Sequence, residues 1–105
     1  MPLAGIERDG EPDFRRQAVG FWMFVEPIEV RPFRPVRIYV TFEALTHIDP
    51  SQSINSLTAL EVFRNNRTAI EAAASAKFDA SGVDEGEFGG KPTVTVLPED
   101  LASIK

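Results

Sequence analysis

The sequence predicts a two-layer α+β fold, with a small antiparallel sheet of about three strands packed against one long helix and a short helix. Two observations indicate strands: residues 36–41 and 93–97 alternate apolar and polar side chains, and residues 21–25 form a short aromatic run. A third observation indicates a long helix: apolar residues recur with helical periodicity from near Ser53 or Ser56 to Phe78. The order strand, strand, helix, helix, strand then favours one sheet layer and one helix layer.

The chain length fits one domain, because 105 residues leave no room for a second core. Residues 1–13 contain glycine and proline among charged residues and show no periodicity, which predicts a flexible leader. Residues 14–105 are then expected to form a single α+β domain.

The predicted elements have recognisable boundaries. Prolines between residues 27 and 35 predict a loop after the first strand, because proline cannot donate a hydrogen bond to a sheet. Thr41 is suited to cap a helix over residues 42–48, which Pro50 would end. The apolar stripe of the long helix consists of Leu60, Phe63, Ile70, Ala74 and Phe78.

Composition excludes several kinds of chemistry. Without cysteine the chain has no disulfide, thiolate nucleophile or cysteine metal site, and with His47 as its one histidine it has no multi-histidine metal site. The chain shows neither a signal-peptide pattern nor an apolar run of about 20 residues for a membrane span. We therefore expect a cytoplasmic protein with no membrane contact and no cofactor.

The sequence contains no convincing catalytic motif. His47 with Asp49 and nearby serines has the composition of a catalytic triad, but such close neighbours at a helix end more often form caps and turns. The acids of residues 79–87 lack EF-hand spacing, and Gly89-Gly90-Lys91 is followed by proline rather than the serine or threonine of a P-loop. We predict no catalytic or metal-binding residue and consider an enzyme the least favoured class.

The strand at residues 21–25 predicts an interface. Phe21, Met23 and Val25 point to one side, whereas Trp22 and Phe24 point to the other, and three strands with one helix layer cover only one side. An uncovered apolar set indicates a homodimer or an unidentified protein partner. The alternative is that the proline segment or the short helix folds over Trp22.

Arg67 is the second unusual residue, because the helical wheel places it within the apolar stripe. It must extend to water, pair with a carboxylate or bind an anion, with Lys77 and Asn66 on the adjacent face. A structural ion pair is the favoured interpretation. The candidate partners are Glu26, Glu29, Glu99 and Asp100.

The strip from Arg31 to Arg37 interleaves arginines with Phe33 and has the composition of a nucleic-acid contact. The net charge of −5 argues against this interpretation, and a solvated loop is favoured.

A family resemblance rests on the helix segment. Residues 60–63, Asn66-Arg67, Ile70-Glu71, Ala74 and Lys77-Phe78 resemble the signature helix of the bacterial domain-of-unknown-function family 1488. Residues 40–45 resemble the family's strand leading into its first short helix, and residues 94–97 with Asp100-Leu101 resemble its closing strand. The resemblance implies a small bacterial α+β protein and brings no established activity, so Arg67, Lys77, Asn66 and Glu71 are candidate functional or structural positions only.

These observations favour a non-catalytic, self-associating interaction module. The alternative is a regulatory protein that binds an anion or nucleic acid through Arg67 and Lys77 or through the strip from Arg31 to Arg37.

Overall fold

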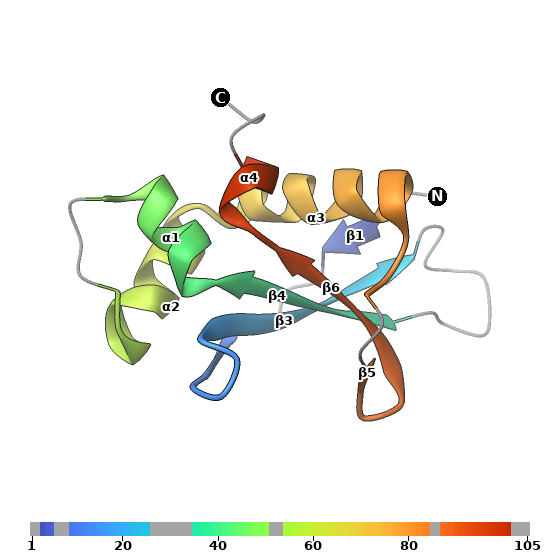
Figure 1. Cartoon of the computed structure of the whole chain (residues 1–105), viewed down its shortest axis with the longest axis horizontal. Helices are drawn as coiled ribbons and strands as arrows, with labels where there is room; N and C mark the ends of the chain where they lie inside the picture. The colour runs from blue at the N-terminus through green and yellow to red at the C-terminus, as the bar shows by residue number, and fades with distance from the viewer. Residues whose placement is uncertain (1–2, 6–8, 26–34, 51–53, 85–86, 102–105) are drawn as a thin grey trace.

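The computed structural model describes residues 3–5, 9–25, 35–50, 54–84 and 87–101. Within these ranges the chain forms one sheet covered on one face by helices (Figure 1). The α+β class predicted from the sequence is therefore confirmed.

The sheet has six strands, with β1, β3, β4, β6 and β5 side by side in that order, and β2 paired to β3. The β4–β6 pair is parallel and the other pairs are antiparallel. The strands are β1 (Leu3–Gly5), β2 (Glu11–Asp13), β3 (Ala18–Val25), β4 (Pro35–Thr41), β5 (Glu87–Phe88) and β6 (Lys91–Val96).

Two features of the sheet correct the sequence prediction. The sheet is mixed rather than antiparallel, because the helices between β4 and β6 form a crossover that returns the chain in the same direction. It also has more than the three predicted strands. The sequence did not indicate β1, β2 and β5 because these strands contain only two or three residues each, too few to show a periodic pattern.

The sequence predicts a flexible leader over residues 1–13, whereas residues 3–5 and 11–13 form the strands β1 and β2. Both segments pair with the eight-residue strand β3, which would otherwise present an open edge. Leu3 of β1 is also buried in the core, and its backbone N–H donates to the hydroxyl of Ser75 at 3.0 Å.

The described residues form four helices, which make up the helix layer. As predicted, Thr41 caps α1, because its hydroxyl accepts a hydrogen bond from the Ala44 N–H at 3.0 Å. The helices are α1 (Phe42–Ile48), α2 (Ser56–Asn65), α3 (Arg67–Ser81) and α4 (Pro98–Leu101).

The long helix predicted up to Phe78 is two helices with a break at Asn66. Asn66 has φ −124° and ψ 18°, outside the helical region. Its side chain donates to the Val62 carbonyl at 2.9 Å, and its backbone N–H is shared between the carbonyls of Val62 and Phe63 at 3.1 and 3.2 Å, an arrangement common at helix ends.

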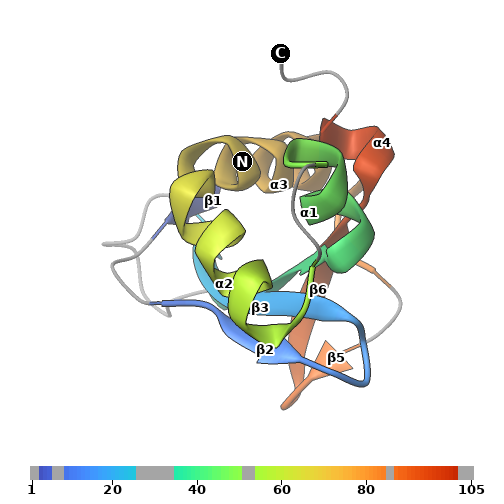
Figure 2. The same cartoon turned by 90° about the vertical axis from the view of Figure 1, so that its left-hand side faces the viewer.

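The core lies between the sheet and the helices, which Figure 2 shows on one side of the sheet. The alternate residues of β3 that begin with Val19 point into it, and the Phe21 and Phe63 rings pack with centroids 4.8 Å apart. The buried side chains of β4 and β6 on this face are Val36, Ile38, Val40, Val94 and Val96.

Candidate functional site

The second face of the sheet, called the outer face below, has no helix packed on it among the described residues (Figure 2). The strand register places Trp22 opposite Arg37, and Gly20 opposite Tyr39. Residues directly opposite in neighbouring strands point to the same side, so these residues share the outer face. Phe88 of β5 joins them, with its ring 5.9 Å from that of Trp22.

Phe88 reaches the outer face through a tight turn. Gly89 and Gly90 connect β5 to β6 with φ values of 57° and 78°. Two successive residues with positive φ form the type of two-residue turn that matches the twist of a hairpin. The turn brings β5 alongside β6, at the edge of the sheet.

Arg37 is the central charged residue of the outer face. Its side chain is almost completely buried, with 4% of the residue exposed. The carbon of its guanidinium lies 4.6 Å from the Phe88 ring centroid, 5.1 Å from that of Trp22 and 5.5 Å from that of Tyr39. Three aromatic faces therefore stabilise the cation.

Two polar atoms in this cluster have no hydrogen-bond partner. They are Nε of Arg37 and the hydroxyl of Tyr39, and both are buried. A buried polar group without a partner costs free energy. The outer face thus contains an unsatisfied donor on a cation, next to an unsatisfied hydroxyl.

Gly20 makes the close packing of this cluster possible. A Cβ atom at position 20 would lie 2.7 Å from Nη2 of Arg37 and 2.9 Å from Cε1 of Tyr39. The missing side chain therefore provides the space in which the guanidinium lies over the strand. Gly20 lies inside β3, which begins three residues before the strand predicted at residues 21–25.

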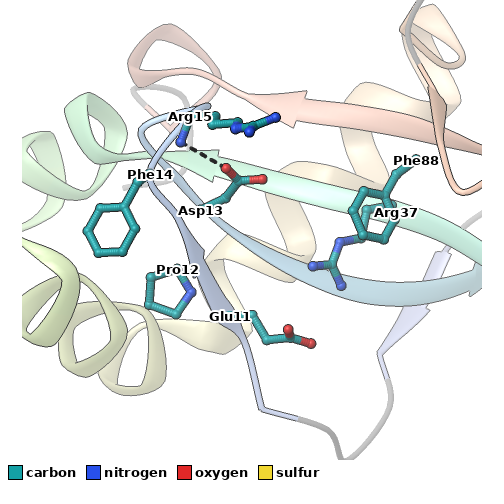
Figure 3. A pocket seen from close by; sticks show the side chains of 7 residues that line it. All are labelled: Glu11, Pro12, Asp13, Phe14, Arg15, Arg37 and Phe88. Atoms are coloured by element: carbon teal, nitrogen blue, oxygen red, sulfur yellow. Dashed lines mark hydrogen bonds between the residues drawn. The ribbon is translucent and has the colours of Figure 1, made fainter.

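A hollow of about 380 Å³ lies beside Arg37 (Figure 3). Its charged groups have both signs and its remaining walls are apolar. It is lined by Glu11, Pro12, Asp13, Phe14, Arg15, Arg37 and Phe88.

The turn between β2 and β3 orders one side of this hollow. The Asp13 carboxylate accepts hydrogen bonds from the backbone N–H groups of Arg15 and Arg16, at 3.0 and 3.2 Å. The Arg16 guanidinium lies 4.3 Å from the Tyr39 ring centroid. Asp13 is thus engaged in the turn, while the side chains of Glu11 and Arg15 are exposed.

The structure places Arg67 at the start of α3. Its Nε lies 3.1 Å from a carboxylate oxygen of Glu71, four residues later, and its guanidinium lies 5.4 Å from the Phe63 ring centroid. Glu71 was not among the predicted carboxylate partners. Of those, Glu26 and Glu29 lie outside the described residues.

Lys77 and Asn66 have structural contacts. The Lys77 ammonium donates to the carboxylate of Asp100 at 2.8 Å and to the Thr95 carbonyl at 2.7 Å. Asn66 forms the junction of α2 and α3. The candidate helix residues therefore form two separate ion pairs and one helix junction rather than one cluster.

The predicted interface residues Trp22 and Phe24 are partly buried, and their positions in β3 place both on the outer face. Arg31 and Arg34 of the arginine strip lie outside the described residues, and Arg37 belongs to β4 rather than to a solvated loop. The sequence alone does not indicate the cluster around Arg37. The alternation in residues 36–41 puts Arg37 and Tyr39 on one face, but only the register places Trp22 beside them.

The described part of the chain contains no group of three His, Asp or Glu side chains arranged to hold a metal ion. None of its helices combines the length and apolar composition that a membrane span requires.

The fold and the outer face define a small two-layer α+β protein with one helix-covered core and an arginine–aromatic cluster on the open side of its sheet. Residues 8–88 match the family described as "Protein of unknown function (DUF1488)", and the chain belongs to this family. The predicted family resemblance is confirmed.

A solved structure agrees with this assignment. The chain is similar in fold to the crystal structure of a protein of unknown function from the DUF1488 family of Shewanella loihica PV-4, with a TM-score of 0.67 and 20% identity. The similarity covers 90% of this chain and 91% of that chain, so it extends over nearly the whole fold. No curated protein matches the chain in sequence.

Proposed function

We propose that the protein is a non-catalytic interaction module that self-associates, and that its contact surface is the outer face of the sheet. The proposal is carried by the position of Trp22 and Phe24 on this face, where Trp22 lies beside Phe88, which is 38% exposed. Apolar groups gathered on an open face are typical of interaction sites.

The residue types of the outer face support this proposal. Interfaces are enriched in aromatic side chains and arginine, and the residues that contribute most to binding are commonly tryptophan, tyrosine and arginine. Trp22 and Phe88 supply the accessible aromatic surface of the Arg37 cluster, whereas Arg37 and Tyr39 are buried within the chain.

The charges of the outer face favour a second copy as the partner. In a two-fold symmetric dimer the same surface patch contacts itself, so a patch with both signs of charge can be complementary to itself. Glu11 and Arg15 are both exposed at the hollow beside Arg37. Each could therefore approach the opposite charge of the other copy.

The test is the mass of the protein in solution, measured by sedimentation velocity over a wide range of protein concentration. We expect the wild type to form a dimer and Trp22→Ser to shift the equilibrium towards monomer. The matched control is Leu57→Ser, which removes an apolar side chain that is 83% exposed on α2. This control should leave the dimer unchanged. A wild-type monomer at every concentration, or equal effects of the two variants, would refute the proposal.

Binding of nucleic acid through Arg67 and Lys77 is less well supported. Both side chains form ion pairs within the helix layer, with Glu71 and Asp100. The net charge of −5 also opposes a polyanion.

A further inference from the structure

The arginine at the centre of the outer face has an unusual environment. Arg37 is 4% exposed, and its Nε has no hydrogen-bond partner. No carboxylate of the described residues lies within ion-pair distance of its guanidinium, which contacts aromatic rings instead. Aromatic faces stabilise a cation, but they supply no oxygen to accept its N–H bonds.

The guanidinium lines the hollow shown in Figure 3. Its volume of about 380 Å³ is within the range of small-molecule sites. The hollow therefore has room for a small anion with further atoms attached.

The walls and charges of the hollow select among anions. Pro12, Phe14 and Phe88 supply apolar surface to the walls, and Phe88 lies against the cation. Glu11 and Asp13 supply negative charge, which repels a dianion such as phosphate more strongly than a singly charged carboxylate. The lining thus favours a single negative charge joined to an apolar body.

We infer that this hollow is a binding site for a small carboxylate with an apolar body. The carboxylate accepts hydrogen bonds from the terminal nitrogens of Arg37, and the body of the ligand packs against Phe14 and Phe88. Arg15, which is exposed at the same hollow, adds a second positive charge. The site is complete within one copy of the chain, so the inference does not depend on self-association.

Trp22 is the only tryptophan of the chain, and it lies 5.1 Å from the Arg37 guanidinium carbon. Its fluorescence therefore reports on the site. The experiment titrates the full chain with cyclohexanecarboxylate, acetate or inorganic phosphate at constant ionic strength, with calorimetry as a second readout. We expect cyclohexanecarboxylate to bind about tenfold more tightly than acetate, because it buries more apolar surface. Phosphate should bind more weakly than cyclohexanecarboxylate.

Variants locate the binding and separate it from folding. Arg37→Gln should abolish binding, while Arg64→Gln, at an exposed arginine on α2, should leave it unchanged. Arg15→Gln keeps the buried cluster intact, so it tests the hollow even where Arg37→Gln unfolds the chain, and it should weaken binding several-fold. Glu11→Gln should strengthen phosphate binding more than carboxylate binding.

Three outcomes would overturn the inference. The first is the absence of saturable binding to the wild type, and the second is equal affinity for acetate and cyclohexanecarboxylate. The third is tighter binding of a blocked aspartate peptide than of cyclohexanecarboxylate, because the natural source would then be an acidic side chain of a partner. Each titration is made at a concentration where sedimentation shows one species. Failure of carboxylate binding and failure of self-association are therefore distinguishable.

Discussion

Lys77 joins three parts of the fold through its contact with Asp100. The distance from its ammonium nitrogen to a carboxylate oxygen of Asp100 is 2.8 Å, and the same oxygen accepts the backbone N–H of Leu97 at 2.8 Å. The ammonium also donates to the Thr95 carbonyl in β6. This one side chain therefore connects α3 with both β6 and α4.

The first prediction concerns this contact. Lys77→Met removes the ion pair and leaves the partly buried Asp100 carboxylate with one fewer donor, so it should lower the free energy of unfolding by about 1 kcal/mol. Urea denaturation measures the change. The matched control Lys91→Met, at an exposed position of β6, should alter stability by less than about 0.5 kcal/mol. Equal losses in both variants would contradict the structural role of Lys77.

The second prediction concerns Gly20. Gly20→Ala places a methyl group 2.7 Å from Nη2 of Arg37, so either the guanidinium or the strand must move. We expect a loss of stability of about 1–3 kcal/mol, as for other overpacked sites. The Trp22 emission should also change, because the guanidinium lies against its ring. Unchanged stability with unchanged emission would show that Gly20 does not shape the cluster.

The third prediction concerns pH. The Arg64 guanidinium donates to the Asp9 carboxylate, and this hydrogen bond lowers the pKa of Asp9 below its ordinary value of 3.8. A lowered pKa in the folded state means that the interaction stabilises the fold above the unfolded-state pKa, and that this contribution is lost as the pH falls through the folded-state pKa.

Thermal unfolding of wild type and Asp9→Asn checks this prediction. The wild type should melt at a higher temperature at about pH 7, and the difference should disappear at about pH 2. The effect should be small, because both side chains are at least half exposed and solvent screens the pair. A difference that persists at the acidic pH would contradict the assignment to Asp9 ionisation.

The fourth prediction separates Arg67 from the binding surface. Arg67→Met removes the ion pair with Glu71, in which each side chain is about three-quarters buried. The variant should lower the free energy of unfolding by about 1 kcal/mol or less. The cost is limited because a cation at the start of α3 is opposed by the helix dipole. Carboxylate affinity, measured by the Trp22 titration, should not change. A loss of affinity would place Arg67 in the binding site.

Elements defined by local chemistry could be predicted from the sequence. The alternation of residues 36–41 identified β4, and Thr41 identified the start of α1, because both signals depend on near neighbours. The break at Asn66 could not be predicted, because the apolar pattern continues across it and the non-helical backbone of Asn66 leaves no sign in that pattern. The predicted α+β class is nevertheless correct, because the same face of the sheet can be covered by one long helix or by two shorter ones.

The candidate site depended on information that no local pattern contains. Trp22 and Phe24 were identified by their place on the second face of β3, which alternation alone supplies. Arg37 was passed over because its surroundings come from β3, β4 and β5, whose register is set by tertiary contacts. The sequence therefore predicted Arg37 to lie in a solvated loop, although it is buried.

The parallel pairing of β4 with β6 has a consequence for synthesis of the chain. During translation β4 emerges long before β6, so the edge that β6 will cover remains open until Lys91–Val96 has been made. An open apolar edge is a template for aggregation. The same holds for any fragment that ends before Lys91, including one cut to the family match at residues 8–88. Strand β6 thus completes the parallel pair after all the helices between β4 and β6 have been made, and chains that stop short of it are the ones that quality control would have to remove.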